Sequence, residues 1–213
     1  MTENNYIDLN DPYNKNSKQS MSLLHVACAN SMVEIVEYLL SKGASTSSRD
    51  PGGVTPIHLA SQKGPVEVLN LFLNYKTSLF IKDDNQQTIA HHAARADAPG
   101  KVFDWIYSKW SQDKSHKVKT KTDVLDVVDK WNRTPLHWAS VNGHRNAVLK
   151  LMDLGCDKKK RDGNGETPME IAERRAKCGA AELRPVGMRA SAFGDIAKLL
   201  GGSGSTKQVS KYT

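Results

Sequence analysis

One five-residue pattern recurs along this chain at a nearly constant interval. Its copies read LLHVA, PIHLA, IAHHA, PLHWA and PMEIA, and their central residues are His25, His58, His91, His137 and Glu170. Three of the four steps between these central residues are 33 residues long, and the step from His91 to His137 is 46. A fixed period of this length is typical of structural units that stack on one another, so it decides how every other motif is interpreted.

A second landmark keeps the same phase, because an aspartate stands five residues before a threonine in four consecutive units. The pairs are Asp50 and Thr55, Asp83 and Thr88, Asp129 and Thr134, and Asp162 and Thr167. In TPIHLA and TPLHWA the threonine suits a helix N-cap and the proline suits the first helical turn. After each pentapeptide, apolar residues are spaced as on one side of a second helix. Each unit is therefore predicted to be a turn followed by two helices.

This unit resembles the ankyrin repeat, whose 33-residue period carries the signature T-P-L-H-x-A. The resemblance covers about residues 17–202 and implies an all-α solenoid of about five stacked helix-turn-helix repeats with β-turn fingers. It also implies that the histidine side chain ties the threonine to the adjacent turn by hydrogen bonds. We therefore interpret the four histidines as scaffold, since no nucleophile or acid recurs beside them.

The repeat phase also predicts the domain boundaries. We expect a flexible N-terminal segment over residues 1–17, a repeat domain over 18–202 and a flexible tail over 203–213. The expected repeats are 18–49, 50–82, 83–128, 129–161 and 162–202, with an inserted loop at 111–126 and an inserted segment at 176–194. The end repeats match the signature less well, as expected of caps.

Composition limits the setting and the chemistry. The chain has a formal net charge of +7, which favours acidic partners, nucleic acid or anionic lipid without choosing among them. It lacks an apolar run of the roughly 18 residues that a membrane helix needs. Its three cysteines, Cys28, Cys156 and Cys178, form no C-x-x-C pair. We expect a monomeric cytoplasmic protein, also present in the nucleus if the basic run KKKR acts as an import signal. We expect neither a metal nor a cofactor.

The resemblance also locates a candidate binding surface. Partners of such proteins dock on the concave side, which is formed by the turn tips and the open side of each first helix. The side chains that these positions assign to protein binding are Lys63, Gln87, Arg95, Lys130, Trp131, Arg133, Trp138, Asn142, Arg174 and Arg175. Trp131 stands out, because a turn tip offers it little core and tryptophan beside arginine is typical of interface hot spots. The alternative to partner contact is that Trp131 packs against Trp138 or the inserted loop. Trp105 is interpreted as a core residue and Trp110 as a loop anchor.

Two groups of basic residues suggest a second surface. Lys117, Lys119 and Lys121 belong to the lysine-rich stretch 109–121, and Lys158, Lys159, Lys160 and Arg161 precede the fifth repeat. A solvated loop is the default interpretation, and an electrostatic site for nucleic acid or anionic lipid is the alternative. The predicted function is a non-catalytic module that binds an intracellular protein, as an adapter, an assembly chaperone or an inhibitor. A hydrolase is disfavoured, since no acid–base or nucleophile–base pair is present.

Overall fold

The computed structural model of the chain describes residues 9–10, 20–112, 125–178 and 189–201, and every regular element within them is a helix. The helices follow one another in pairs. The first helices are α1 (Leu23–Ala29), α3 (Pro56–Lys63), α5 (Ile89–Arg95), α8 (Pro135–Asn142) and α10 (Pro168–Cys178). The second helices are α2 (Val33–Ser41), α4 (Val66–Asn74), α6 (Gly100–Gln112), α9 (Arg145–Asp153) and α11 (Arg189–Gly201).

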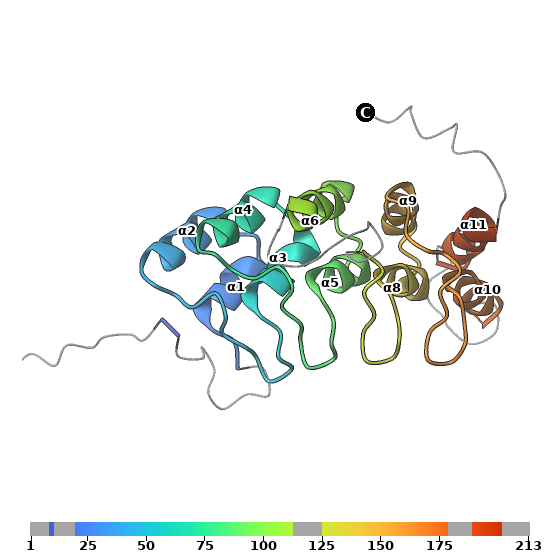
Figure 1. Cartoon of the computed structure of the whole chain (residues 1–213), viewed down its shortest axis with the longest axis horizontal. Helices are drawn as coiled ribbons and strands as arrows, with labels where there is room; N and C mark the ends of the chain where they lie inside the picture. Colours follow the sequence, from blue (N-terminus) through green and yellow to red (C-terminus); the bar gives the residue numbers. More distant parts are fainter. Residues whose placement is uncertain (1–8, 11–19, 113–124, 179–188, 202–213) are drawn as a thin grey trace, which may run out of the picture.

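The helix pairs stack in the order of the sequence. Each first helix contacts the next first helix, from α1 through α3, α5 and α8 to α10. Figure 1 shows the first helices in one row and the second helices in another, with the connecting turns extending from the first-helix row. We call these turns fingers; they comprise residues 42–55, 75–88, 126–134 and 154–167. The predicted all-α ankyrin solenoid is confirmed.

The sequence explains where the first helices begin. Thr55, Thr88 and Thr134 are the N-cap residues of α3, α5 and α8 and have extended backbones, as an N-cap requires. Pro56 and Pro135 follow at the first helical position, where the missing N–H leaves no hydrogen bond unmade. The threonine–proline signature therefore fixes the start of the helix, and so the position of the finger before it.

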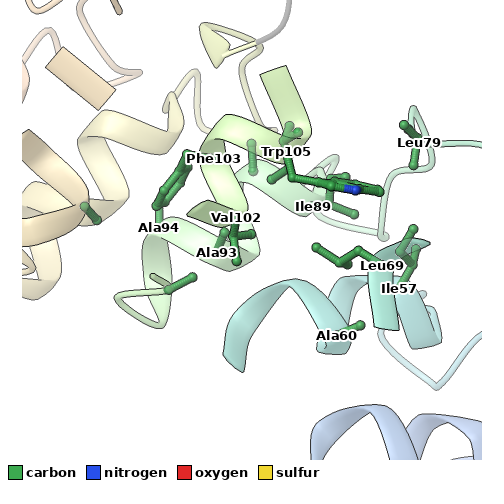
Figure 2. Close-up of a cluster of buried hydrophobic side chains, with 14 of the residues drawn as sticks. Ile57, Ala60, Leu69, Leu79, Ile89, Ala93, Ala94, Val102, Phe103 and Trp105 are labelled. Atoms are coloured by element: carbon green, nitrogen blue, oxygen red, sulfur yellow. The ribbon is translucent and has the colours of Figure 1, made fainter. Parts of the chain in front are cut away.

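Burial between neighbouring repeats makes the core. Figure 2 shows one part of it, in which Ile57 and Leu69 from the second repeat lie close to Ile89 and Val102 from the third. All four of these side chains are fully buried. Alanines at the end of the pentapeptide, such as Ala93, are buried too and let adjacent first helices approach closely. Because each repeat contacts only its neighbours, the core is continuous along the stack rather than central.

Helix α6 is longer than the other internal second helices and carries two buried tryptophans. Trp105 is 6% exposed and donates its indole N–H to Asn70 Oδ1 at 2.7 Å. Trp110 is fully buried, and its ring stacks on Phe80 with the ring centres 4.7 Å apart. Trp105 is a core residue, as predicted. Trp110 is buried too, but most of the inserted loop for which it is the predicted anchor lies outside the described residues. None of the helices in the described part of the chain is long and apolar enough to cross a bilayer.

Candidate protein-binding surface

The histidine of each signature joins its own N-cap to the next finger. Nδ1 of His137 accepts a hydrogen bond from the Thr134 backbone N–H at 3.1 Å and lies 2.8 Å from Thr134 Oγ1. Because Nδ1 is an acceptor, the proton of the neutral ring is on Nε2, which donates to the Glu166 carbonyl at 3.2 Å. One side chain thus connects two consecutive repeats.

The other signatures repeat this bridge with small differences. His25 and His91 donate to the carbonyls of Val54 and Arg133 at 3.0 and 2.9 Å. His58 binds Thr55 in the same way, but its buried Nε2 has no hydrogen-bond partner among the described residues. In the fifth repeat the carboxylate of Glu170 replaces the ring and accepts from the Thr167 backbone N–H at 2.7 Å.

Burial keeps these histidines neutral. Loss of hydration lowers the pKa of His25 and His137, and it lowers the pKa of His58 to about 3 and that of His91 to about 4. A ring that stays neutral keeps Nδ1 as an acceptor and Nε2 as a donor, which is the state that both bonds of the bridge need. The interpretation of the signature histidines as scaffold is confirmed.

Each finger is held by its aspartate. In the fourth repeat, Oδ1 of Asp129 accepts from the backbone N–H groups of Trp131 and Arg133, both at 2.9 Å. The finger turns at Asn132, which has a positive φ of 59°, a conformation that asparagine tolerates better than most residues. The Trp131 carbonyl in turn accepts from the Gly163 N–H of the next finger at 2.8 Å. The backbone of Trp131 is therefore fixed on both sides.

The same carboxylate positions a second indole. Oδ2 of Asp129 accepts from Trp138 Nε1 at 2.8 Å and from Gln87 Nε2 at 3.3 Å. The rings of Trp131 and Trp138 meet edge to face with their centres 6.2 Å apart. Trp138 is half-buried on α8, whereas Trp131 is 41% exposed at the finger tip. Two indoles thus form one surface, which extends from the finger onto the helix.

Three cations lie over these indoles. The Arg95 and Arg133 guanidinium carbons are 5.0 and 5.3 Å from the Trp138 ring centre, and Lys130 Nζ is 4.4 Å from the Trp131 ring centre. These distances are within the range of cation–π attraction. We call Arg95, Lys130, Trp131, Arg133 and Trp138 the cation–indole cluster. It contains half of the residues that the sequence assigned to protein binding, brought together from two repeats.

The acidic neighbour of the cluster is already paired. Arg133 Nε donates to Oδ2 of Asp162 at 3.3 Å, and the Asp162 side chain is only 1% exposed. Burial would raise the pKa of Asp162, but hydrogen bonds from the Glu166 and Asn164 backbones and from Arg133 hold it below its usual value. Asp162 thus holds Arg133 in place while offering almost no negative charge to solvent.

The other residues assigned to binding lie in different surroundings. Gln87 departs from the prediction: it is 1% exposed, because its side chain lies between Asp129 and Arg95 Nη1, to which its Oε1 is bonded at 2.9 Å. Asn142 is half-buried and donates to the Trp138 carbonyl at 3.0 Å. Arg174 forms a two-bond pair with Glu166, at 2.7 and 2.9 Å.

Two further residues assigned to binding lie outside this network. Lys63 is exposed at the end of α3, and Arg175 is half-buried on α10. The cation–indole cluster therefore does not include them.

The basic run before the fifth repeat is partly engaged in internal contacts. Lys160 Nζ donates to the Asp126 carbonyl at 2.8 Å, and Arg161 pairs with Glu170 at 3.0 Å and also contacts the Gly165 carbonyl. Lys158 is half-buried and Lys159 is exposed. Lys117, Lys119 and Lys121 lie outside the described residues.

Sequence reasoning missed one polar contact that recurs between finger and helix. The fourth residue of the pentapeptide is His92 in the third repeat and Trp138 in the fourth, and each reaches Oδ2 of its finger aspartate. His92 Nε2 lies 3.0 Å from Asp83, as Trp138 Nε1 lies 2.8 Å from Asp129. A side chain with an N–H group at the fourth position of the pentapeptide, nine residues after the finger aspartate, is the signal in the sequence that predicts both contacts. Among the residues described, no group of three or more His, Cys, Asp or Glu could hold a metal ion.

Comparison with known proteins agrees with this architecture. The sequence matches the family described as ankyrin repeats in three copies, over residues 4–83, 24–118 and 73–162. The chain therefore belongs to the ankyrin repeat family, a fold that is typically non-catalytic and generally mediates protein–protein interaction.

Its similar relatives are larger proteins. The chain is 28% identical over 180 residues to palmitoyltransferase ZDHHC13 of Homo sapiens, across 73% of this chain and 29% of that protein. It is 30% identical over 168 residues to palmitoyltransferase AKR1 of Kluyveromyces lactis, across 78% and 21%. It is 26% identical over 158 residues to a transient receptor potential cation channel subfamily A member 1 homolog of Caenorhabditis elegans, across 74% and 12%. The chain thus spans less than a third of the length of these relatives.

Proposed function

We propose that this chain is a non-catalytic protein-binding module that recognises its partner at the cation–indole cluster. A module of this kind would act as an adapter, an assembly chaperone or an inhibitor. The observation that carries the proposal is the placement of Trp131, which is 41% exposed although its backbone is held by Asp129 and Gly163. A large exposed side chain on a rigid backbone loses little conformational entropy on binding, so it favours recognition. A cytoplasmic setting and a monomeric chain are part of the proposal.

The electrostatic alternative has less support. The charged groups of Lys160 and Arg161 have partners within the repeat stack, whereas those of Lys158 and Lys159 have none among the described residues. The other lysines of this alternative, Lys117, Lys119 and Lys121, lie outside the described residues. Association with nucleic acid or anionic lipid would need several cations facing one phosphate surface. The cation–indole cluster therefore explains a binding role better than the basic run does.

Affinity capture tests the proposal. The bait would be the wild type beside a Trp131→Ala, Arg133→Ala double variant, with mass spectrometry of the proteins retained from a cell extract. A Tyr38→Ala variant is the matched control, because Tyr38 is an aromatic residue 60% exposed on α2, away from the fingers. The proposal predicts that specific proteins are lost with the double variant and kept with the control. Retention of the same proteins by the double variant, with an unchanged circular dichroism spectrum, would contradict it.

A further inference from the structure

We infer that the partner presents an acidic extended segment, whose carboxylates bind the cations of the cluster while its apolar side chains contact Trp131. This inference rests on the proposed function and adds the chemistry of the partner. Three observations support it: the cations of the cluster keep unused donors, cations cover faces of the indole rings, and the neighbouring carboxylates are buried or paired.

The cations of the cluster keep unused hydrogen-bond donors. Arg95 uses Nη1 to bind Gln87 Oε1, and Arg133 uses Nε to bind Asp162. Their remaining N–H groups, and the ammonium of Lys130, have no bond to any residue of the described chain. A guanidinium that lies over an indole ring can still donate in its own plane, in the geometry that a carboxylate accepts with two oxygens. The cluster therefore offers donors without matching acceptors.

The position of the two arginines suits a single segment. Both guanidinium carbons lie within 5.3 Å of the same Trp138 ring centre, although Arg95 comes from α5 and Arg133 from the next finger. Arg95 is exposed, and the Arg133 side chain is 21% exposed. An extended segment that crosses from one repeat to the next would thus meet both guanidinium groups and then Trp131.

Neighbouring carboxylates compensate only part of the positive charge of the cluster. Asp129 is 5% exposed and accepts four hydrogen bonds, so it organises the cluster without offering a free charge. Asp162 is buried beneath Arg133. Glu166, one repeat further along, is paired with Arg174. Arg95 and Lys130 thus have no carboxylate partner among the described residues, and Arg133 keeps N–H groups that Asp162 does not use. The cluster retains a positive charge, and its electrostatic complement is an acidic surface.

Single-stranded nucleic acid fits the cluster less well than an acidic peptide. Nucleic-acid bases bind such surfaces by stacking on open aromatic faces. Here guanidinium groups lie over the Trp138 ring, and Lys130 lies over the Trp131 ring. What the cations leave accessible is N–H donors and the rest of the Trp131 side chain. Carboxylates beside an apolar residue match both.

Selection from a displayed library of random peptides on the immobilised chain tests the inference. Enriched peptides should contain more Asp and Glu than the starting library, together with an apolar residue. Arg95→Gln and Arg133→Gln together should weaken binding of the enriched peptides by at least about tenfold, since a hydrogen bond to a charged group contributes more than a neutral one. Their affinity should also fall as salt is raised. Arg145→Gln is the matched control, because Arg145 is exposed on α9 and the substitution removes the same charge away from the fingers.

The outcomes separate this inference from the function on which it rests. If the enriched peptides are neutral and Trp131→Ala abolishes their binding, the proposed protein-binding function is supported and the acidic partner is ruled out. Acidic peptides that bind the double arginine variant as tightly as the wild type would overturn the inference, as would a selection that enriches no peptide. A thymidine oligonucleotide that binds more tightly than the enriched peptides, and is lost with the arginines, would replace the inferred partner with nucleic acid.

Discussion

The indole N–H of Trp138 donates to Oδ2 of Asp129 at 2.8 Å, and this contact couples the first helix of the fourth repeat to its finger. The other oxygen of the same carboxylate holds the backbone of Trp131 and Arg133. One buried side chain therefore sets the positions of both indoles and one cation of the cluster. In the second repeat, the equivalent Asp50 binds the backbone of its own finger, at Gly52 and Val54.

Asp129 holds the Trp138 indole as well as its own finger, and this second contact predicts the effect of Asp129→Asn. An amide oxygen can still accept from the finger backbone, but the amide NH₂ cannot accept from the Trp138 indole. We expect partner or peptide affinity to fall together with a loss of about 1–3 kcal/mol in the free energy of unfolding. Urea titration and a binding titration measure the two effects. Asp50→Asn should leave binding unchanged, and equal binding by the two variants would argue against positioning by Asp129.

Gly163→Ala should disturb the support of Trp131. A Cβ at Gly163 would lie 2.9 Å from the Trp131 carbonyl oxygen, so the two fingers would have to separate and their 2.8 Å hydrogen bond would weaken. We expect a loss of about 1–2 kcal/mol in stability and weaker binding. Gly194→Ala on α11 is the control, because a Cβ there meets no atom within 4 Å and alanine favours helix. If Gly163→Ala unfolds at the same urea concentration as wild type or at a higher one, the finger contact contributes nothing.

Leu136→Ala tests the stack itself. Leu136 is fully buried on α8, and truncating such a side chain costs about 2–5 kcal/mol through lost burial and a residual cavity. Because neighbouring repeats stabilise one another, we expect one cooperative transition at a lower urea midpoint. Leu149→Ala removes the same atoms from a half-buried position on α9 and should cost less. An unchanged midpoint for Leu136→Ala would contradict its place in the core.

The buried histidines predict a dependence of stability on pH. Their ordinary pKa is 6.5, whereas burial lowers the pKa of His91 to about 4 and that of His58 to about 3. Below pH 6.5 the unfolded chain therefore binds protons that the folded chain does not, and the free energy of unfolding falls as pH falls. Above pH 6.5 this stabilising contribution is fully present. Urea midpoints should therefore stay nearly constant between about pH 7.5 and pH 6.5 and then decrease toward pH 5.

A His91→Gln variant isolates the histidine contribution. Burial raises the pKa of Asp126, so this carboxyl acts in the opposite sense as pH falls. Wild type and variant share that effect, and the variant lacks one histidine. We expect its midpoint to fall less between the two pH values than that of the wild type. Identical changes in both proteins would show that His91 does not titrate with the depressed pKa described here.

The fold could be predicted from the sequence because its signals are local. Within one unit the threonine cap, the proline and the histidine lie within a few residues of one another, and the unit recurs with a 33-residue period. The scaffold role of His137 follows from the same recurrence. The period does not predict which carbonyl each ring reaches, and His58 Nε2 has no such bond among the described residues.

The arrangement of the site could be predicted only in part. Sequence position placed Trp131 and Arg133 at the finger tip, but the approach of Arg95 to Trp138 joins residues from different repeats. Gln87 was assigned to the open surface because its position in the repeat is usually exposed. It is buried because two charged neighbours, Asp129 and Arg95, both bond its amide. Such contacts depend on which side chains meet across repeats, and the repeat period carries no information about that.

Site-specific photocrosslinking tests the central claim most directly. A photoreactive phenylalanine analogue would replace Trp131 in one protein and Tyr38 in another, and each would be irradiated in a cell extract that contains the captured partner. Both positions carry exposed aromatic residues, so the comparison isolates location. The account predicts a crosslink to the partner from position 131 and none from position 38. A crosslink from position 38 alone would place recognition on the outer helices and contradict the account.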